Sequence, residues 1–309
     1  MVIMARVWTQ DRLKKALLFT KLQKIKFPRL KNIRKVRDFS AITISQLKKL
    51  KLIKEALPLN QLKKLKDMKQ IMLVFKKDYK LDKEPLVSII IPAYNEEGYI
   101  EKLLKSIKHQ TYKNYEIIVV DNDSTDKTAE IARKYTDKVY YCPRDGFSAS
   151  AARNLGAKFA KGEILLIIDA DHYLDDKNII FKVVHNLEKK PKYGAGSFRI
   201  APLEGTMKGR VMFAFINVVK TFQPFPAGFF FCRKEYFDAI GGYNENIGST
   251  EECDLIYRMK KHTKIKFFKN AKYRTSERRI IEQGLWYPLK EWTLSYYRKK
   301  DTKDYKTIR

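Results

Sequence analysis

Short apolar runs alternate with helical stretches between residues 86 and 168, and this alternation most restricts the fold of the chain. The apolar runs are LVSIII, YEIIVV, KVYYC and EILLII, and the stretches between them are YIEKLLKSIKHQ, KTAEIARKY and SASAARNLGAKFAKG. Strands that alternate with helices form βαβ units, which build a parallel sheet covered on both faces. We therefore expect an α/β fold with a mostly parallel sheet and helices on both faces.

Polar residues follow three of the four apolar runs at the point where each run ends. The three polar stretches are PAYNEE, DNDS and DADH. In a parallel sheet, ligands bind beyond the carboxyl ends of the strands. The sequence therefore predicts that these three stretches meet in one crevice.

Two carboxylates, Asp169 and Asp171, stand directly after the fourth apolar run. Along an extended chain they point to the same side, and two like charges so close repel each other unless a cation lies between them. Magnesium and manganese prefer oxygen ligands and bridge to substrate phosphates, so we expect Mg²⁺ or Mn²⁺ here. The ordinary alternative is a loop aspartate that caps a helix. His172 directly follows the pair. One alternative is that it touches the metal site, but a lone loop histidine is more often solvated, and that is the expectation here.

The chain is strongly basic, and the charge is concentrated near its start. Residues 1–84 hold 24 of the 64 lysines and arginines but only 7 of the 35 acidic residues. Leucines recur there at helical spacing, so we expect a basic helical extension that either lies on an anionic membrane surface or packs on the main domain. Residues 281–309 combine tryptophan and tyrosine with lysine, which is typical of an interfacial tail.

The three cysteines, Cys142, Cys232 and Cys253, are scattered and form no CxxC pair. They are read as reduced thiols in a cytosolic setting. No apolar run approaches the roughly 20 residues of a membrane-spanning helix. We therefore expect a cytoplasmic protein, with peripheral binding to the cytoplasmic membrane face as a hypothesis.

Five motifs, in order along the chain, resemble those of family 2 glycosyltransferases with the GT-A fold. They are VSIIIPAYNEEGYI, IIVVDNDSTDKT, ARNLGA, LLIIDADHYLD and RKEYFDAIGGYNEN followed by EECDLIYRM. The resemblance implies a GT-A domain over residues 85–280, between the extension 1–84 and the tail 281–309. It also implies transfer of a sugar, with inversion, from a nucleotide-diphosphate donor to the hydroxyl of a glycan or lipid-linked acceptor.

The resemblance also implies roles for single residues. Asp169 and Asp171, on either side of Ala170, correspond to the metal-binding pair of the family. The positions expected to bind the donor are Pro92, Tyr94, Glu96, Asp121, Asp123, Arg153, Asp169, Ala170, Arg278 and Arg279. Tyr173 replaces the glutamine that related dolichyl-phosphate sugar transferases carry two residues beyond the second aspartate.

The acceptor hydroxyl must lose a proton as it attacks, and a carboxylate can accept it. The family usually has Glu-Asp at the start of the helix that contains this base, with the aspartate as the base. Here the pair is Glu251 and Glu252, so Glu252 stands at the base position and Glu251 is the alternative. Either one is a carboxylate with one methylene more than the family's aspartate.

Two readings compete with the transferase. The net charge of +29 also suits a nucleic-acid- or membrane-binding protein built on an inactive GT-A fold. No recognised nucleic-acid motif is present, so no specific nucleic acid is expected. A nucleotidyltransferase would carry a glycine-rich basic loop after its first strand, and PAYNEEGY differs from that pattern.

Overall fold

The computed structural model describes residues 81–284, except 82, 145–147, 223–225 and 249. The predicted extension over 1–84 and the predicted tail over 281–309 lie almost entirely outside the described residues. Eight strands are described: β1 Val87–Ala93, β2 Tyr115–Asp121, β3 Val139–Tyr141, β4 Ile164–Ile168, β5 His172–Tyr173, β6 Tyr193–Pro202, β7 Phe229–Arg233 and β8 Lys264–Thr275. The helices of this part are α6 Ile100–Lys108, α7 Thr128–Arg133, α8 Ser148–Phe159, α9 Ile179–Lys189, α10 Met207–Phe222, α11 Lys234–Ala239, α12 Glu251–Met259 and α13 Arg278–Gln283.

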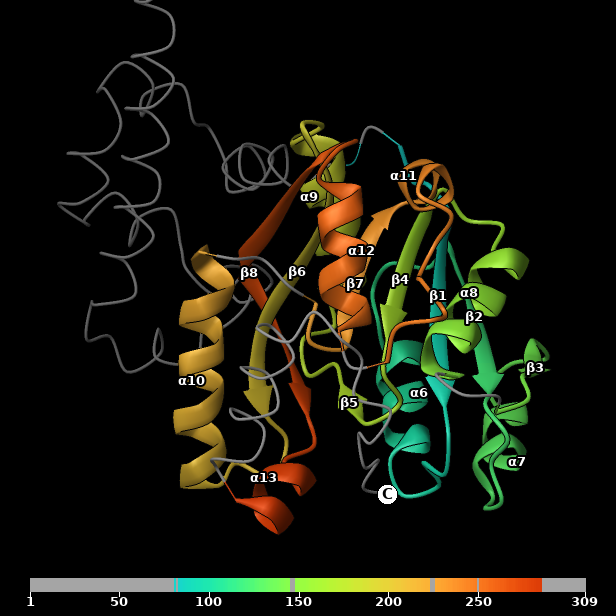
Figure 1. Cartoon of the computed structure of the whole chain (residues 1–309). Helices are drawn as coiled ribbons and strands as arrows, with labels where there is room; N and C mark the ends of the chain where they lie inside the picture. Colours follow the sequence, from blue (N-terminus) through green and yellow to red (C-terminus); the bar gives the residue numbers. More distant parts are fainter. Residues whose placement is uncertain (1–80, 82, 145–147, 223–225, 249, 285–309) are drawn as a thin grey trace, which may run out of the picture. The chain divides into compact units, whose positions relative to one another are not determined.

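One sheet carries all eight strands in the order β3-β2-β1-β4-β7-β6-β8-β5 (Figure 1). The half from β3 to β4 is parallel, as the alternation of strands and helices predicts. β7 runs antiparallel to both of its neighbours, and β6 then pairs in parallel with β8. The sheet is therefore mixed, with four parallel pairings among seven.

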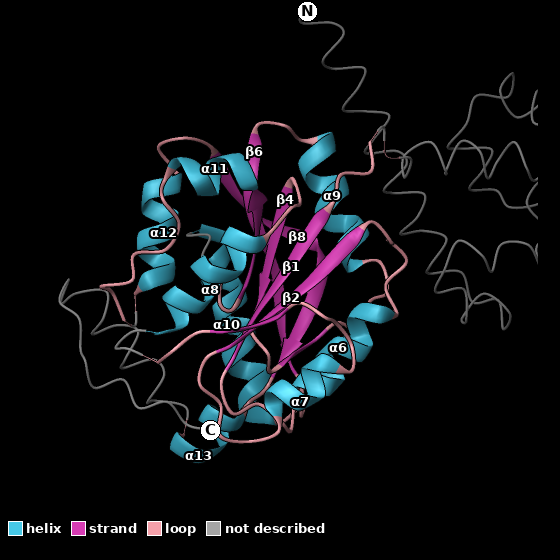
Figure 2. Cartoon of the chain, turned by 90° about the vertical axis from the view of Figure 1, so that its right-hand side faces the viewer, coloured by secondary structure: helices cyan, strands magenta, loops and turns pink. Residues whose placement is uncertain are grey.

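Helices cover both faces of the sheet, as expected (Figure 2). One hydrophobic core lies under α6, α9 and α10, and a second lies under α8, α11 and α12. β1 shows why its sequence is apolar throughout: Ile89 and Ile91 face the first core, while Ile90 faces the second. A strand buried on both faces has no solvent side for polar residues.

Aromatic side chains fill the core around β6, β7 and β8. Phe198 lies between Phe229 and Phe231, with ring centroids 5.7 and 5.1 Å away. Tyr273 of β8 stacks on Phe229 at 4.6 Å. This packing fixes β8 relative to β7. The segment before β7 and the segment after β8 therefore lie at the same edge as the carboxyl ends of the parallel strands.

Among the residues that the structure describes, no helix has the length and apolar character to cross a membrane.

Candidate active site

Hydrogen bonds hold together the two loops that follow β1 and β2. The backbone N–H of Asn95 donates to Ser124 Oγ at 3.0 Å, and that of Glu96 donates to Thr128 Oγ1 at 2.7 Å. In return the backbone N–H of Thr125 donates to Asn95 Oδ1 at 2.8 Å. The hydroxyl and amide side chains of DNDSTDKT therefore position the loop that presents Glu96.

Besides Glu96, four of the residues expected to bind the donor lie at the ends of β1 and β2: Pro92, Tyr94, Asp121 and Asp123. Pro92 is in β1, and the guanidinium of Arg144 lies over the ring of Tyr94, 3.7 Å from its centroid. Asp121 closes β2 opposite Ala93 and is almost fully buried.

Asp123 occupies a left-handed backbone conformation, with φ of 67°, that turns the loop after β2. Its Oδ1 accepts a hydrogen bond from the hydroxyl of Tyr141 at 2.9 Å. The end of β4 carries a charged network around Asp169 and Asp171, described below. Within the described part of the chain, the hydrogen bonds of Asp121 and Asp123 go to other residues, Ser124 and Tyr141. They border that network through the neighbouring β1 loop.

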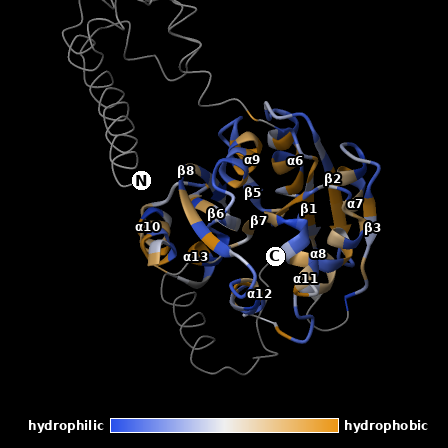
Figure 3. Cartoon of the chain, turned by 90° about the horizontal axis from the view of Figure 1, so that it is seen from above, coloured by the Kyte–Doolittle hydropathy of each residue, from blue (hydrophilic) through white to orange (hydrophobic). Residues whose placement is uncertain are grey.

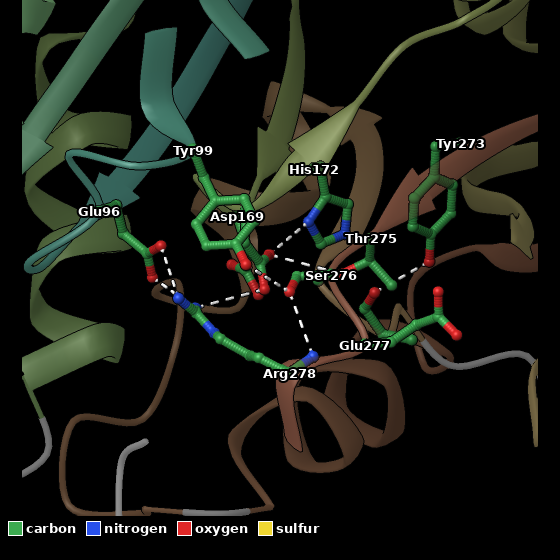
Figure 4. A network of polar contacts seen from close by, with 12 residues as sticks. Glu96, Tyr99, Asp169, His172, Tyr273, Thr275, Ser276, Glu277 and Arg278 are labelled. Carbon is green, nitrogen blue, oxygen red and sulfur yellow. Dashed lines mark hydrogen bonds and ion pairs between the residues drawn. The ribbon is translucent and has the colours of Figure 1, made fainter. Parts of the chain in front are cut away.

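Arg278 joins the loop after β1 to the carboxylate pair after β4 (Figure 4). Its two terminal nitrogens donate to the two oxygens of buried Glu96, at 3.0 and 2.6 Å. The Nη2 atom also lies 3.4 Å from Asp171 Oδ2. The guanidinium packs over the ring of Tyr99, 5.1 Å from its centroid. A fork of this kind binds planar oxyanions in a defined orientation.

The carboxylate pair itself is held by different cations. Asp169 Oδ1 accepts from Arg153 Nη2 at 3.0 Å, and the Asp169 side chain stays 35% exposed. Asp171 is more enclosed. Burial alone would raise its pKa, but the hydrogen bond from His172 and the charges of His172 and the arginines at 278 and 279 outweigh burial and lower the pKa to about 2. Asp171 is therefore ionised under ordinary conditions. Ala170 between the pair is buried.

His172 is buried, and the expectation that it is solvated was wrong. Its Nδ1 lies 2.9 Å from Asp171 Oδ1, and its ring stacks on Tyr273 with centroids 4.9 Å apart. Burial lowers the pKa of His172, but the hydrogen bond and charge of Asp171 outweigh it, so the pKa is raised. The reason for the burial is that β5 pairs His172 with Thr275, which places the ring beneath β8.

Glu252 lies on the other side of Asp169, at the start of α12. Its two carboxylate oxygens accept hydrogen bonds from the backbone N–H groups of Ala227 and Gly228, each at 2.9 Å. The carbonyl of Gly228 in turn accepts from the backbone N–H of Asp169 at 3.0 Å. A single loop, residues 226–228, therefore separates Glu252 from the carboxylate pair.

Gly228 is required for this close approach. Its φ is 73°, and a Cβ at this position would lie 2.5 Å from Asp169 Oδ2 and 2.7 Å from His172 Cε1. A left-handed backbone also disfavours residues other than glycine.

The neighbouring glutamates differ in their partners. Glu251 Oε1 accepts a hydrogen bond from Arg153 Nη1 at 3.0 Å, whereas Glu252 accepts hydrogen bonds from the backbone N–H groups of Ala227 and Gly228. Burial raises the pKa of Glu252 to about 7; Arg153 opposes this, and the charges of Glu251 and Asp169 add to it. Burial also raises the pKa of Glu251, against the charge of Arg153. With a pKa of about 7, Glu252 can change its protonation state near neutral pH.

Glu277, a residue that sequence reasoning missed, holds the segment before α13. It is fully buried and accepts hydrogen bonds from the backbone N–H groups of Gly205 and Thr206 and from the Thr206 hydroxyl. A Cβ on Gly209 would overlap its carboxylate. Glu277 therefore anchors Arg278 to the start of α10. Arg279, the next residue, is half-buried and contributes its charge to the low pKa of Asp171.

The donor atoms at the end of β4 fit a hard divalent cation. Among the described residues, no three His, Cys, Asp or Glu side chains form a closed metal site. Asp169 and Asp171 offer carboxylate oxygens, and Asp169 Oδ2 faces the space that Gly228 leaves free of a side chain. Two carboxylates suit a cation such as Mg²⁺, which takes its other ligands from water and substrate phosphates.

Comparison with known proteins identifies the family. The model of glycosyl transferase family 2 matches residues 88–244, just over half of the 309-residue chain. An uncharacterised glycosyltransferase of Rickettsia felis is 28% identical over 209 residues, covering 63% of this chain and 35% of the relative. A 4,4'-diaponeurosporenoate glycosyltransferase of Staphylococcus haemolyticus is 35% identical over 133 residues, covering 41% of this chain and 35% of the relative. The chain thus spans about a third of the length of these curated relatives.

Solved structures share the fold. The mannosyltransferase PcManGT of Pyrobaculum calidifontis, in complex with GDP-mannose and Mn²⁺, is 21% identical, with a TM-score of 0.52 over 66% of this chain and 63% of its own. TarS of S. aureus is also 21% identical, with a TM-score of 0.52 over 62% of this chain and 36% of its own. The fold, the ordered motifs and the family model agree: the chain belongs to glycosyl transferase family 2.

Proposed function

We propose that the chain transfers a sugar from a nucleotide-diphosphate donor to an acceptor hydroxyl. One observation carries the proposal: Arg278 joins Glu96 to Asp171, so the loop after β1, the carboxylate pair after β4 and the basic start of α13 meet at one edge of the sheet. That edge is where an α/β sheet binds its ligands. The fold neighbour PcManGT was solved with GDP-mannose and Mn²⁺, which supports a donor of this class.

In the proposed site, Asp169 and Asp171 would hold Mg²⁺ or Mn²⁺, which when bound neutralises the diphosphate and assists its departure. Arg278, whose guanidinium is held by Glu96, would bring its positive charge to the diphosphate, and Arg279 would add positive charge. Glu96 orients Arg278 and borders the nucleoside region formed by Pro92, Tyr94, Asp121 and Asp123. Arg153 holds Asp169 and Glu251 in fixed positions.

Glu252 is proposed as the general base. It lies one loop away from Asp169, and its pKa near 7 allows it to accept the acceptor's proton at neutral pH. A carboxylate on the far side of the sugar from the leaving diphosphate is the arrangement needed for inversion.

The donor proposal is tested by thermal unfolding of the full chain with UDP, GDP, CDP and ADP, each with and without Mn²⁺. Ligand at about 100 times its Kd stabilises a protein by roughly 2.7 kcal/mol, which for a domain of this size raises Tm by about 5–10 °C. We expect a Mn²⁺-dependent rise with at least one nucleotide, abolished in Asp171→Asn.

The matched control is Asp175→Asn, because Asp175 is a nearby carboxylate that pairs with Arg274 outside the network. It should keep the nucleotide response. If none of the nucleotides stabilises the wild type, the transferase proposal fails, and the alternative of an inactive fold that binds polyanions is favoured.

A further inference from the structure

Exposed hydrophobic side chains gather on one helix of the described part. In Figure 3 the ribbon of α10 carries hydrophobic (orange) segments at the edge of the fold. In the described part of the chain nine large hydrophobic residues are exposed, and five of them belong to α10. Their exposed fractions are 72% for Met207, 56% for Val211, 52% for Phe215, 57% for Val218 and 84% for Phe222. Spacings of four, four, three and four residues place them on a single face of the helix. We call these five residues the α10 outer face.

The opposite face of α10 is fixed to the protein. Met212, Phe213 and Ile216 are buried in the core beside β6. The side chain of Asn217 binds both the backbone N–H and the carbonyl of Ile200, at 2.9 and 2.8 Å. The helix is therefore held in place, so loose packing does not explain the exposure of its outer face.

A surface helix ordinarily turns charged residues to water. α6 does so: its exposed positions are Glu101, Lys102, Lys105 and Lys108. α10 carries no acidic residue at all, and its outer face is apolar for four turns. Apolar residues aligned on an exposed face mark a site of interaction.

Basic residues border the α10 outer face. Lys208 and Arg210 are exposed in its first turn. A helix with phenylalanine on one side and lysine or arginine beside it is typical of segments that lie in the head-group region of a bilayer. Anionic lipids attract such basic side chains by about 1 kcal/mol each.

A membrane fits these features better than the other candidate occupants. The segments outside the described residues are basic: residues 1–80 hold 23 lysines and arginines against 5 acidic residues, and 285–309 hold 7 against 3. Either segment would bring like charge to Lys208 and Arg210. The other candidate is a second copy of the chain. Five side chains of roughly 200 Å² each, half to four-fifths exposed, could bury about 600 Å² of surface on that copy. A standard protein–protein interface buries ~800 Å² per partner, so the face is small for a dimer.

We propose that the α10 outer face docks on an anionic lipid bilayer. The five hydrophobic side chains enter the boundary between head groups and acyl chains, and Lys208 and Arg210 contact lipid phosphates. Because Glu277 ties the start of α10 to Arg278, docking fixes the distance between the candidate donor site and the membrane. That consequence, which favours a lipid-linked acceptor, rests on the proposed transferase function.

Flotation of the full chain with vesicles tests the proposal. Vesicles of phosphatidylcholine alone are compared with vesicles containing about 30% phosphatidylglycerol, at about 0.1 and 0.5 M salt. At the higher salt, charge attraction by the basic extension is screened within a few ångströms, while apolar insertion remains. The variant Phe215→Ser/Phe222→Ser should bind ~100-fold more weakly than the wild type at 0.5 M salt.

The matched control is Tyr257→Ser, which removes an aromatic side chain that is 68% exposed on α12. It should float as the wild type does. Lys208→Glu/Arg210→Glu should reduce, relative to the wild type, the preference for anionic over neutral vesicles at the lower salt, where the basic extension also attracts anionic lipid. All variants change exposed residues, and their Tm values are compared with that of the wild type to confirm folding.

Two results would overturn the proposal. One is equal vesicle binding by the wild type and the double phenylalanine variant. The other is a dimer in sedimentation that the double variant dissociates, without vesicle binding, which would assign the face to a second copy. Nucleotide-dependent stabilisation is measured on the same proteins: a variant that loses vesicle binding but keeps the nucleotide response separates this proposal from the donor site.

Discussion

Replacement of Glu252 by glutamine is expected to remove most of the transferase activity while leaving nucleotide binding intact. A positioned general base contributes about 10²–10⁴ in rate, equivalent to ~3–5 kcal/mol in the barrier. Glutamine keeps the size of the side chain but cannot accept the proton. We therefore expect kcat to fall at least ~100-fold. The Kd of the nucleoside diphosphate should change little, because the contacts of Glu252 are to the 226–228 loop and not to the residues proposed to bind the donor.

The pH dependence gives this prediction a second measure. With a pKa of about 7, wild-type kcat/KM should rise tenfold per pH unit below 7 and level off above it, and the variant should lack this limb. The effect on stability has the opposite sense. The folded-state pKa lies above the ordinary 4.5, so the folded protein holds the proton more tightly and loses stability as pH rises from 4.5 to 7, by ~3 kcal/mol.

The glutamine variant should lack that stability slope as well. It should also lose one of the two hydrogen bonds from the backbone N–H groups of Ala227 and Gly228, because the side-chain NH2 of glutamine is itself a donor and cannot accept from an N–H group. The cost is ~1–3 kcal/mol. Release of nucleoside diphosphate, followed with the donor whose nucleotide stabilises the protein, measures the rates. Glu251→Gln is the comparison and should retain the limb near pH 7. A Glu252→Gln enzyme within tenfold of the wild type, or loss of the limb in Glu251→Gln alone, would refute the assignment.

Three further variants test the geometry around this base. Gly228→Ala should destabilise the protein by ~2 kcal/mol or more in urea unfolding, because alanine is strained at φ 73° and its Cβ would meet Asp169 Oδ2 at 2.5 Å. Burial lowers the pKa of Lys220 from 10.5 to about 7, so the free energy of unfolding falls as pH falls through this range. Lys220→Met should remove this slope, which is up to ~1.4 kcal/mol per pH unit between pH 7.5 and 9.5. Arg278→Lys should raise the calorimetric Kd of the nucleoside diphosphate about tenfold, since an ammonium cannot bind both oxygens of Glu96 and its charge is then not held in position at the site.

The parallel half of the sheet could be predicted from sequence because its information is local. The apolar runs that form β1, β2 and β4 are bounded by polar loops, and the helices between them show helical spacing. The carboxylates at the strand ends could be placed at one edge for the same reason, since parallel strands bring their carboxyl ends together.

The other half depends on contacts between distant segments. β6 pairs with β8, so residues 193–202 meet residues 264–275, and no local pattern encodes that pairing. Arg278 is 182 residues from Glu96 in sequence. In the sequence, the basic pair of TSERR is equally compatible with a solvated charged face. Glu277 is fully buried for a reason that only the fold reveals: the start of α10 supplies the backbone donors that it needs.

Binding of Mn²⁺, followed by loss of the free-ion signal in electron paramagnetic resonance, tests the central claim most directly. Asp169 and Asp171 supply too few ligands for a closed site, so Mn²⁺ alone should bind weakly, and a nucleoside diphosphate should increase its affinity to one tightly bound ion per chain. Asp171→Asn should abolish this increase, and Asp175→Asn should preserve it. Failure of UDP, GDP, CDP and ADP alike to increase Mn²⁺ binding to the wild type would contradict the account of a metal-assisted sugar-nucleotide site at the end of β4.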